Sequence, residues 1–118
     1  MFLISKLKSK ISKRREQKTK EYLLNHGLII GDNVNIDFNS IDGLYPWLIE
    51  IGSNILVAPG VKILAHDAST QMYLGKAKIG RVTIGDNVYI GPNCCIVEDV
   101  VIGNNVTIGA GSVVTKDL

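Results

Sequence analysis

The chain has 118 residues, of which 46% are hydrophobic and 20% charged, the composition of one small globular domain rather than of a disordered protein. It contains no apolar run of about 18 residues, so no membrane span is predicted. The apolar stretch near its start, Phe2 to Ile4, is too short for a signal peptide. Its two cysteines, Cys94 and Cys95, are adjacent, which suits neither a disulfide framework nor a zinc site. We therefore expect a cytoplasmic protein.

The formal net charge of +2 hides a strong asymmetry. Residues 1–20 contain eight of the thirteen Lys and Arg residues and one acid, a net +7, whereas residues 21–118 contain five basic and ten acidic residues, a net −5. A basic segment of this kind is typical of a solvated helix that packs on a neighbour, or of binding to nucleic acid or an anionic membrane. We expect no nucleic-acid partner and leave a peripheral membrane contact through residues 1–20 open.

The first 26 residues contain no Gly and no Pro, and Ile4, Leu7 and Ile11 recur at helical spacing. This pattern predicts a helix over roughly 4–25 that ends where Gly27 can adopt a left-handed conformation. We therefore divide the chain into a basic helical arm, 1–26, and a second domain, 27–118. His26 lies at the junction, and we interpret it as a surface or capping residue.

Beyond Gly27 the hydrophobic pattern has a period of six residues. An aliphatic residue returns in phase at Ile84, Ile90, Ile96, Ile102, Ile108 and Val114, and earlier at Ile51, Val57 and Ile63. Such a repeat is too short for a helical unit but fits one short strand and one corner, at which Asn, Asp or Gly tolerates left-handed backbone angles. Three such units complete a triangular coil, so we predict about three and a half to four stacked coils. A β-sandwich, which alternates with period two, does not account for this spacing.

The repeat is interrupted between Ile51 and Ile84, which are separated by 33 positions rather than a multiple of six. Asp67 falls where an inward apolar residue is due, and burying an unpaired carboxylate is costly. We therefore expect the chain to leave the coil at His66 and to form an extruded loop at about 67–79. A second interruption, from Asn39 to Leu48, contains Tyr45, Pro46 and Trp47.

His66 stands at the base of the predicted loop, and long loops in compact domains are often functional. A neutral imidazole can remove a proton from a hydroxyl, and acyl transfer needs a base, a positioned acceptor and an oxyanion donor. An exposed loop histidine without a role is the alternative.

Three segments carry a family resemblance. Ile84 to Gly91 (IGDNVYIG) and Val106 to Asp117 (VTIGAGSVVTKD) resemble the hexapeptide-repeat acyltransferases, and Ile63 to Thr70 (ILAHDAST) is most similar to their sugar O-acetyltransferase branch. The resemblance covers roughly residues 28–118. It implies an all-β fold, a left-handed parallel β-helix, here with a short N-terminal α-helix. It also implies a homotrimer that uses acetyl-CoA.

The same resemblance assigns roles to individual residues. It places the catalytic base at His66, with Asp67 as a candidate to orient the imidazole. The cofactor-binding positions that it implies are Tyr89, Gly91, Ala110, Thr115 and Lys116, although Gly91 and Ala110 also suit plain corners of a coil. We expect no metal, because the carbonic anhydrases that share the fold hold zinc with three histidines and this chain has two.

The chain also departs from the family pattern. Glu98-Asp99 replaces Pro-Gly, Pro92 replaces a serine that many relatives place near the acetyl group, and the sequence stops at Leu118, where relatives continue into a cap. We expect Asp99 to serve as the corner. We expect the inward Ile108 and Val114 of the last coil to be exposed, so that this end needs more chain or association.

The sequence thus predicts an acetyl-CoA-dependent O-acetyltransferase that acts on a hydroxyl of a sugar or glycan. Two alternatives stay open. One is a non-catalytic or truncated β-helix scaffold, and the other is an acetyltransferase whose acceptor is an amino-sugar amine or serine.

Overall fold

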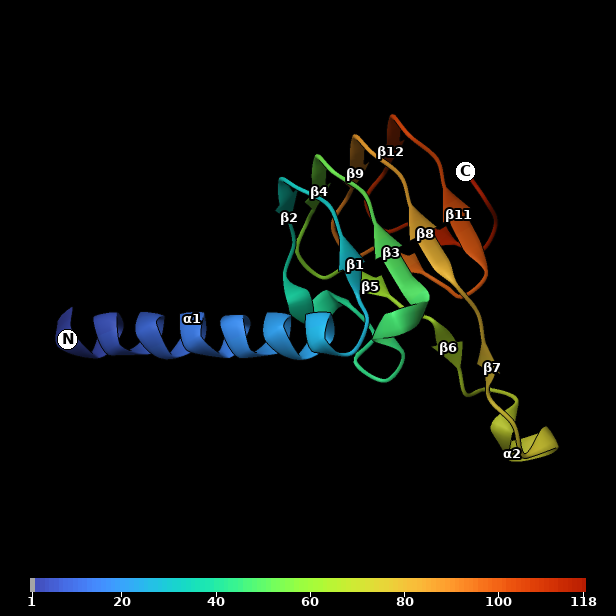
Figure 1. The fold of residues 1–118 in the computed structure, drawn as a ribbon, viewed down its shortest axis with the longest axis horizontal. Coiled ribbons are helices and arrows are strands. Elements are labelled where there is room, and N and C mark those ends of the chain that lie inside the picture. Colours follow the sequence, from blue (N-terminus) through green and yellow to red (C-terminus); the bar gives the residue numbers. More distant parts are fainter. Residues whose placement is uncertain (1) are drawn as a thin grey trace.

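A computed structural model describes residues 2–118, which form a helix followed by a stack of parallel strands (Figure 1). The helix, α1 (Phe2–Asn25), begins two residues before its expected start, and Gly27 follows it with φ +97°. The other helical elements are η1 (Phe38–Ser40), η2 (Pro46–Leu48) and α2 (Gln71–Leu74). The strands are β1 (Ile29–Ile30), β2 (Val34–Asn35), β3 (Ile49–Ile51), β4 (Ile55–Val57), β5 (Lys62–Ile63), β6 (His66–Asp67), β7 (Lys78–Ile79), β8 (Val82–Ile84), β9 (Val88–Ile90), β10 (Cys95–Ile96), β11 (Val100–Ile102), β12 (Val106–Ile108) and β13 (Val113–Val114).

Three parallel sheets form the walls of the stack. The first has the order β1-β3-β8-β11, the second β2-β4-β9-β12 and the third β5-β10-β13, so successive strands along the chain fall in different sheets. Neighbouring strands pair in register, as Ile51 with Ile84 and Ile84 with Ile102. Each coil therefore pairs its backbone with the coils beside it, which is the parallel β-helix that the period of six predicts.

The core is a column of aliphatic side chains inside the three sheets. All nine in-phase positions named from the sequence are buried, from Ile51 through Val114, and Cys94 is buried among them as expected. Leu23 of α1 and Leu28 join the same cluster. The six-residue period is thus confirmed as the pattern that selects inward-facing residues.

Asparagine makes one of the corners. Asn33, Asn54, Asn87 and Asn105 have φ between +55° and +59°. Their side chains also bond from coil to coil, with Nδ2 of each donating to Oδ1 of the next at 3.0–3.2 Å. At another corner Asp99 has φ +62°, so a carboxylate residue does serve as the corner there, as expected.

Between β5 and β8 the chain leaves the stack as a two-stranded arm. β6 pairs antiparallel with β7, His66 opposite Ile79 and Asp67 opposite Lys78, and α2 lies at the tip (Figure 1). The Asp67 side chain is exposed, which agrees with the argument that its carboxylate cannot stay in the core.

The C-terminal end of the stack differs from the expectation. Ile108 and Val114 are only 4% and 6% exposed, so the prediction that the last coil uncovers them is wrong. These side chains point inward, where the three walls of their own coil and the coil below enclose them. The final residues also return to the first sheet, because Leu118 N–H donates to Val101 O at 2.9 Å and Gly103 N–H donates to Leu118 O at 2.8 Å.

Candidate active site

His66 lies at the edge of the stack that follows β5, where the extruded arm begins. Its neighbour Ala65 is fully buried and anchors the backbone, while the His66 side chain is 24% exposed. One face of the imidazole packs against Tyr45, with ring centroids 5.3 Å apart and planes tilted by 50°. Tyr45 in turn meets Trp47 edge-on at 5.4 Å. The second interruption of the repeat thus supplies an aromatic support for the histidine.

Asp42 provides the polar partner of His66. Ile41 bridges to Ile63 of β5, which brings Asp42 beside the start of the arm, where its side chain is only 2% exposed. Asp42 Oδ2 accepts from Ala65 N–H at 3.0 Å and contacts His66 Nδ1, while Oδ1 accepts from Leu44 N–H at 2.9 Å.

This arrangement selects one form of the imidazole. An ionised carboxylate can only accept hydrogen bonds, so the proton of neutral His66 must sit on Nδ1 and donate to Asp42. The other nitrogen, Nε2, then carries a lone pair and can take a proton from a substrate. If it does, the buried carboxylate stabilises the imidazolium that forms.

Asp67 does not have the contact that the sequence predicted for it. Its Oδ1 accepts from Ser69 N–H at 2.8 Å, and this bond, followed by the Ser69 side chain, holds the Asp67 pKa below its ordinary value of 3.8. The carboxylate that meets the imidazole belongs to Asp42 instead, because Asp67 has already turned into the arm. A signal for Asp42 was present, since it stands six residues after Ile36, where the repeat requires an aliphatic residue.

An ion pair joins the arm to the stack. Lys78 Nζ of β7 lies 3.7 Å from Glu98 Oε1, and the Glu98 side chain is nearly buried on the same edge as His66. Glu98 thus helps to hold the second strand of the arm.

Two of the five predicted cofactor positions lie on this edge. β5, β10 and β13 align in the third sheet with Ile63, Ile96 and Val114 in register, so the residues two places after each strand, Ala65, Glu98 and Lys116, fall along one line, and His66 directly follows the first of them. Since coils are spaced by about 4.8 Å, His66 and Lys116 are roughly 10 Å apart along the axis. Thr115 and Lys116 border a hollow of about 360 Å³ at the C-terminal end.

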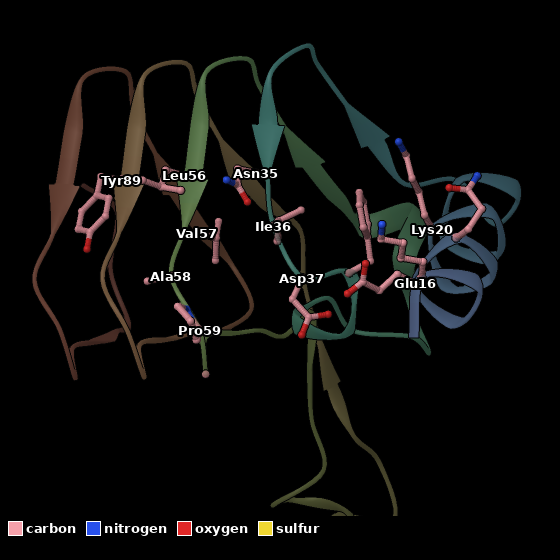
Figure 2. A pocket seen from close by; sticks show the side chains of 14 residues that line it. Glu16, Lys20, Asn35, Ile36, Asp37, Leu56, Val57, Ala58, Pro59 and Tyr89 are labelled. Atoms are coloured by element: carbon pink, nitrogen blue, oxygen red, sulfur yellow. The ribbon is translucent and has the colours of Figure 1, made fainter. Parts of the chain in front are cut away.

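The other three positions lie elsewhere. Tyr89 faces outward on β9 and borders a hollow of about 940 Å³ between α1 and the second sheet, across from Glu16 and Lys20 (Figure 2). A Cβ on Gly91 would lie 2.7 Å from Ala110 N, so the close approach of successive coils by itself requires this glycine. A single copy of the chain therefore does not bring Tyr89, Gly91 and Ala110 to the edge that carries His66.

Comparison with known proteins agrees with this architecture. The family model described as "Bacterial transferase hexapeptide (six repeats)" matches residues 81–116. Protein CapG of Staphylococcus aureus is 39% identical over 123 residues, which cover 98% of this chain and 69% of CapG. Galactoside O-acetyltransferase of Escherichia coli (strain K12) is 38% identical over 92 residues, 75% of this chain and 45% of that protein.

A more distant match extends over much of the chain. The bifunctional protein GlmU of Acinetobacter baumannii (strain AYE) is 32% identical over 126 residues, 86% of this chain and 27% of GlmU. The chain thus spans less than half the length of GlmU and of the galactoside enzyme. The repeat, the parallel coils and these matches together show that the chain belongs to the hexapeptide-repeat transferase family, whose members include acetyltransferases.

Proposed function

We propose that this protein is an acetyl-CoA-dependent O-acetyltransferase that acetylates a hydroxyl of a sugar or glycan, with His66 as the general base. The observation that supports it most directly is the pair of His66 and the buried Asp42, which leaves Nε2 able to accept a proton at the base of the arm. The printed name of the galactoside O-acetyltransferase relative supports the same reaction class and a sugar acceptor.

In the proposed reaction His66 Nε2 takes the proton of the acceptor hydroxyl as its oxygen becomes the nucleophile. Asp42 holds Nδ1, so the ring keeps its orientation and its positive charge is balanced while it carries the proton. Tyr45 packs on the ring and limits its rotation. Acetyl-CoA would supply the acetyl group as a thioester, whose C–S bond breaks as the new ester C–O bond forms. The CoA sulfur leaves as a thiolate and receives the proton that His66 Nε2 took, which gives the free thiol.

The C-terminal end offers features that fit acetyl-CoA. A Cβ at Gly109 or Gly111 would meet no atom of the described residues within 4 Å, so the backbone there is open to an extended ligand. Thr115 and Lys116 are exposed beside it, and the Lys116 ammonium suits a phosphate as a point charge. Thr115 and Lys116 would hold the cofactor on this side.

Assembly completes the proposal. The predicted cofactor residues fall on different edges of one copy, so a second copy is needed for Tyr89, Gly91 and Ala110 to approach the edge of His66. We therefore propose the left-handed, homotrimeric form of the family, with the active site between subunits. We also propose that the chain is divided into the basic N-terminal helical segment 1–26 and the β-helix domain 27–118. We also propose a cytoplasmic location.

The test is acetyl transfer from acetyl-CoA to a panel of sugars, read as free thiol release. We expect His66→Ala to lose at least about a hundredfold in kcat, the usual contribution of a general base. His26→Ala removes the other histidine, which bonds its own helix through Tyr22 O, and should keep full activity. Equal rates for wild type and His66→Ala would contradict the assigned base.

The same panel separates the alternatives. Amino sugars and serine, included as acceptors, report transfer to an amine or to a smaller hydroxyl. Titration calorimetry with acetyl-CoA addresses the scaffold hypothesis, because a chain that binds no cofactor is not an acetyltransferase.

A further inference from the structure

The N-terminal half of α1 exposes a row of aliphatic side chains. Leu3, Ile4, Leu7 and Ile11, named here the stripe, are 79%, 59%, 58% and 42% exposed. Their spacing of three and four residues places them on one face of the helix. Exposure of these four aliphatic side chains to water is unfavourable, and burying them against an apolar phase would lower the free energy.

Basic side chains border the stripe on both sides. At 3.6 residues per turn, Lys8 and Arg15 lie along one side and Lys10 and Arg14 along the other, and all four are exposed. The face behind the stripe carries small hydroxyl residues, Ser5, Ser9 and Ser12. The helix is therefore apolar in the middle of one face and cationic at the margins of that face.

The stripe is turned away from the β-helix. The residues of α1 that border the hollow against the second sheet are Lys13, Glu16, Gln17 and Lys20, of which Figure 2 labels Glu16 and Lys20. At 3.6 residues per turn these residues occupy a different face of the helix, roughly opposite the stripe. The described packing of α1 on the body lies near its C-terminal end, through buried Leu23 and a bond from Tyr22 Oη to Gly43 O at 3.2 Å. Figure 1 shows the rest of α1 projecting beyond the coils.

We propose that α1 docks this protein on an anionic lipid bilayer, with the stripe immersed at the headgroup boundary and the flanking Lys and Arg residues on lipid phosphates. An apolar strip between cationic margins is what an interfacial helix requires, since burial and electrostatic attraction act together. Nucleic acid would use the charges but leave the aliphatic side chains in water. No helix of residues 2–118 is long and apolar enough to cross a bilayer, so the contact is peripheral.

The experiment is vesicle co-sedimentation of the full chain, with phosphatidylglycerol mixed into phosphatidylcholine and with phosphatidylcholine alone. We expect binding to the anionic vesicles, weakened by salt. Leu7→Gln/Ile11→Gln, which removes half of the stripe, should lower partitioning at least tenfold. Lys10→Gln/Arg14→Gln should lower it about 25-fold, because each basic residue at an anionic surface contributes about fivefold.

Matched controls make the faces distinguishable. Ser9→Gln/Ser12→Gln places the same new side chains behind the stripe, and Lys13→Gln/Lys20→Gln removes the same charge from the face toward the hollow, so both variants should bind vesicles nearly as wild type does. Circular dichroism confirms that each variant keeps its helix.

Three results would overturn the proposal. Equal binding to neutral and anionic vesicles would show that the Lys and Arg residues that flank the stripe do not contribute to binding. Binding to a DNA duplex that exceeds vesicle binding and survives Leu7→Gln/Ile11→Gln would assign the helix to nucleic acid. The third result is that wild type does not bind vesicles and that Leu7→Gln/Ile11→Gln sediments as a smaller assembly than wild type does. This result would show that the stripe joins copies of the chain.

Discussion

Replacing Asp42 by asparagine tests the candidate site most sharply, because it changes one buried oxygen into an amide nitrogen at nearly constant volume. Asp42 accepts from three donors, the N–H groups of Leu44 and Ala65 and Nδ1 of His66. An asparagine has one acceptor oxygen and one NH₂ group, so either orientation of the amide leaves at least one donor facing the NH₂.

The two orientations have different consequences. With the oxygen toward Ala65 and His66, the N–H of the exposed Leu44 loses its partner, which costs about 0.5–1.5 kcal/mol of the free energy of unfolding, the usual contribution of one hydrogen bond. With the NH₂ toward His66, Nδ1 becomes the acceptor and Nε2 carries the proton, so the histidine can no longer act as a base. In both cases the negative charge that balances the imidazolium is gone. A hydrogen bond to a charged group contributes about 1.5–3 kcal/mol, so kcat should fall about 10- to 100-fold.

The assay is acetyl transfer by free thiol release, with thermal unfolding of the same samples. Asp67→Asn is the matched control, because it makes the same chemical change beside His66 on a carboxylate that bonds Ser69. We expect Asp67→Asn to keep its kcat while Asp42→Asn loses it. Full activity in Asp42→Asn, or a loss confined to Asp67→Asn, would refute the assignment of Asp42 as the positioning residue.

Two further predictions concern the corner and the arm. Asn87 has φ +57° and its side chain bonds those of Asn54 and Asn105. Asn87→Ala should therefore lower the free energy of unfolding by about 2 kcal/mol in chemical denaturation, through left-handed strain and lost hydrogen bonds, and Asn87→Gly should lower it by about 1 kcal/mol less. Equal losses for the two variants would show that backbone strain is unimportant there. The Asp67 pKa lies below 3.8 in the folded protein, so its stabilising contribution is complete above that pH and is lost as the pH falls through the lower folded value. The difference in thermal midpoint between wild type and Asp67→Asn should therefore be present at neutral pH and vanish in acid, and a difference that persists in acid would contradict the bond to Ser69.

The sequence alone determined the β-helix, the identity of its core and the corners at which it turns. Each six-residue repeat is a complete local unit of one strand of two or three residues and one corner. Its inward aliphatic residue and its left-handed Asn or Asp are therefore only a few positions apart in the sequence. Asp99 illustrates this, because its corner could be inferred from one residue type and is seen at φ +62°. The point at which the chain leaves the coil, His66, could also be inferred locally, because Asp67 stands where the repeat requires an inward apolar residue.

Only the tertiary structure decided which carboxylate meets His66. Asp42 precedes it by 24 positions, and the two side chains come together because Ile41 bridges to Ile63 across neighbouring coils. That register depends on how the irregular segment from Asn39 to Leu48 folds, and irregular segments have no period from which to infer it.

The placement of the predicted cofactor residues and of α1 was also beyond the sequence. Tyr89 and Lys116 belong to one repeat pattern, yet they face different sides of the stack, because the direction of a side chain depends on the sheet in which its strand falls. The heptad-like spacing of Ile4, Leu7 and Ile11 predicted a helix with an apolar face. Whether that face covers the protein or turns away from it is decided by the few contacts of Tyr22 and Leu23, and these direct it outward.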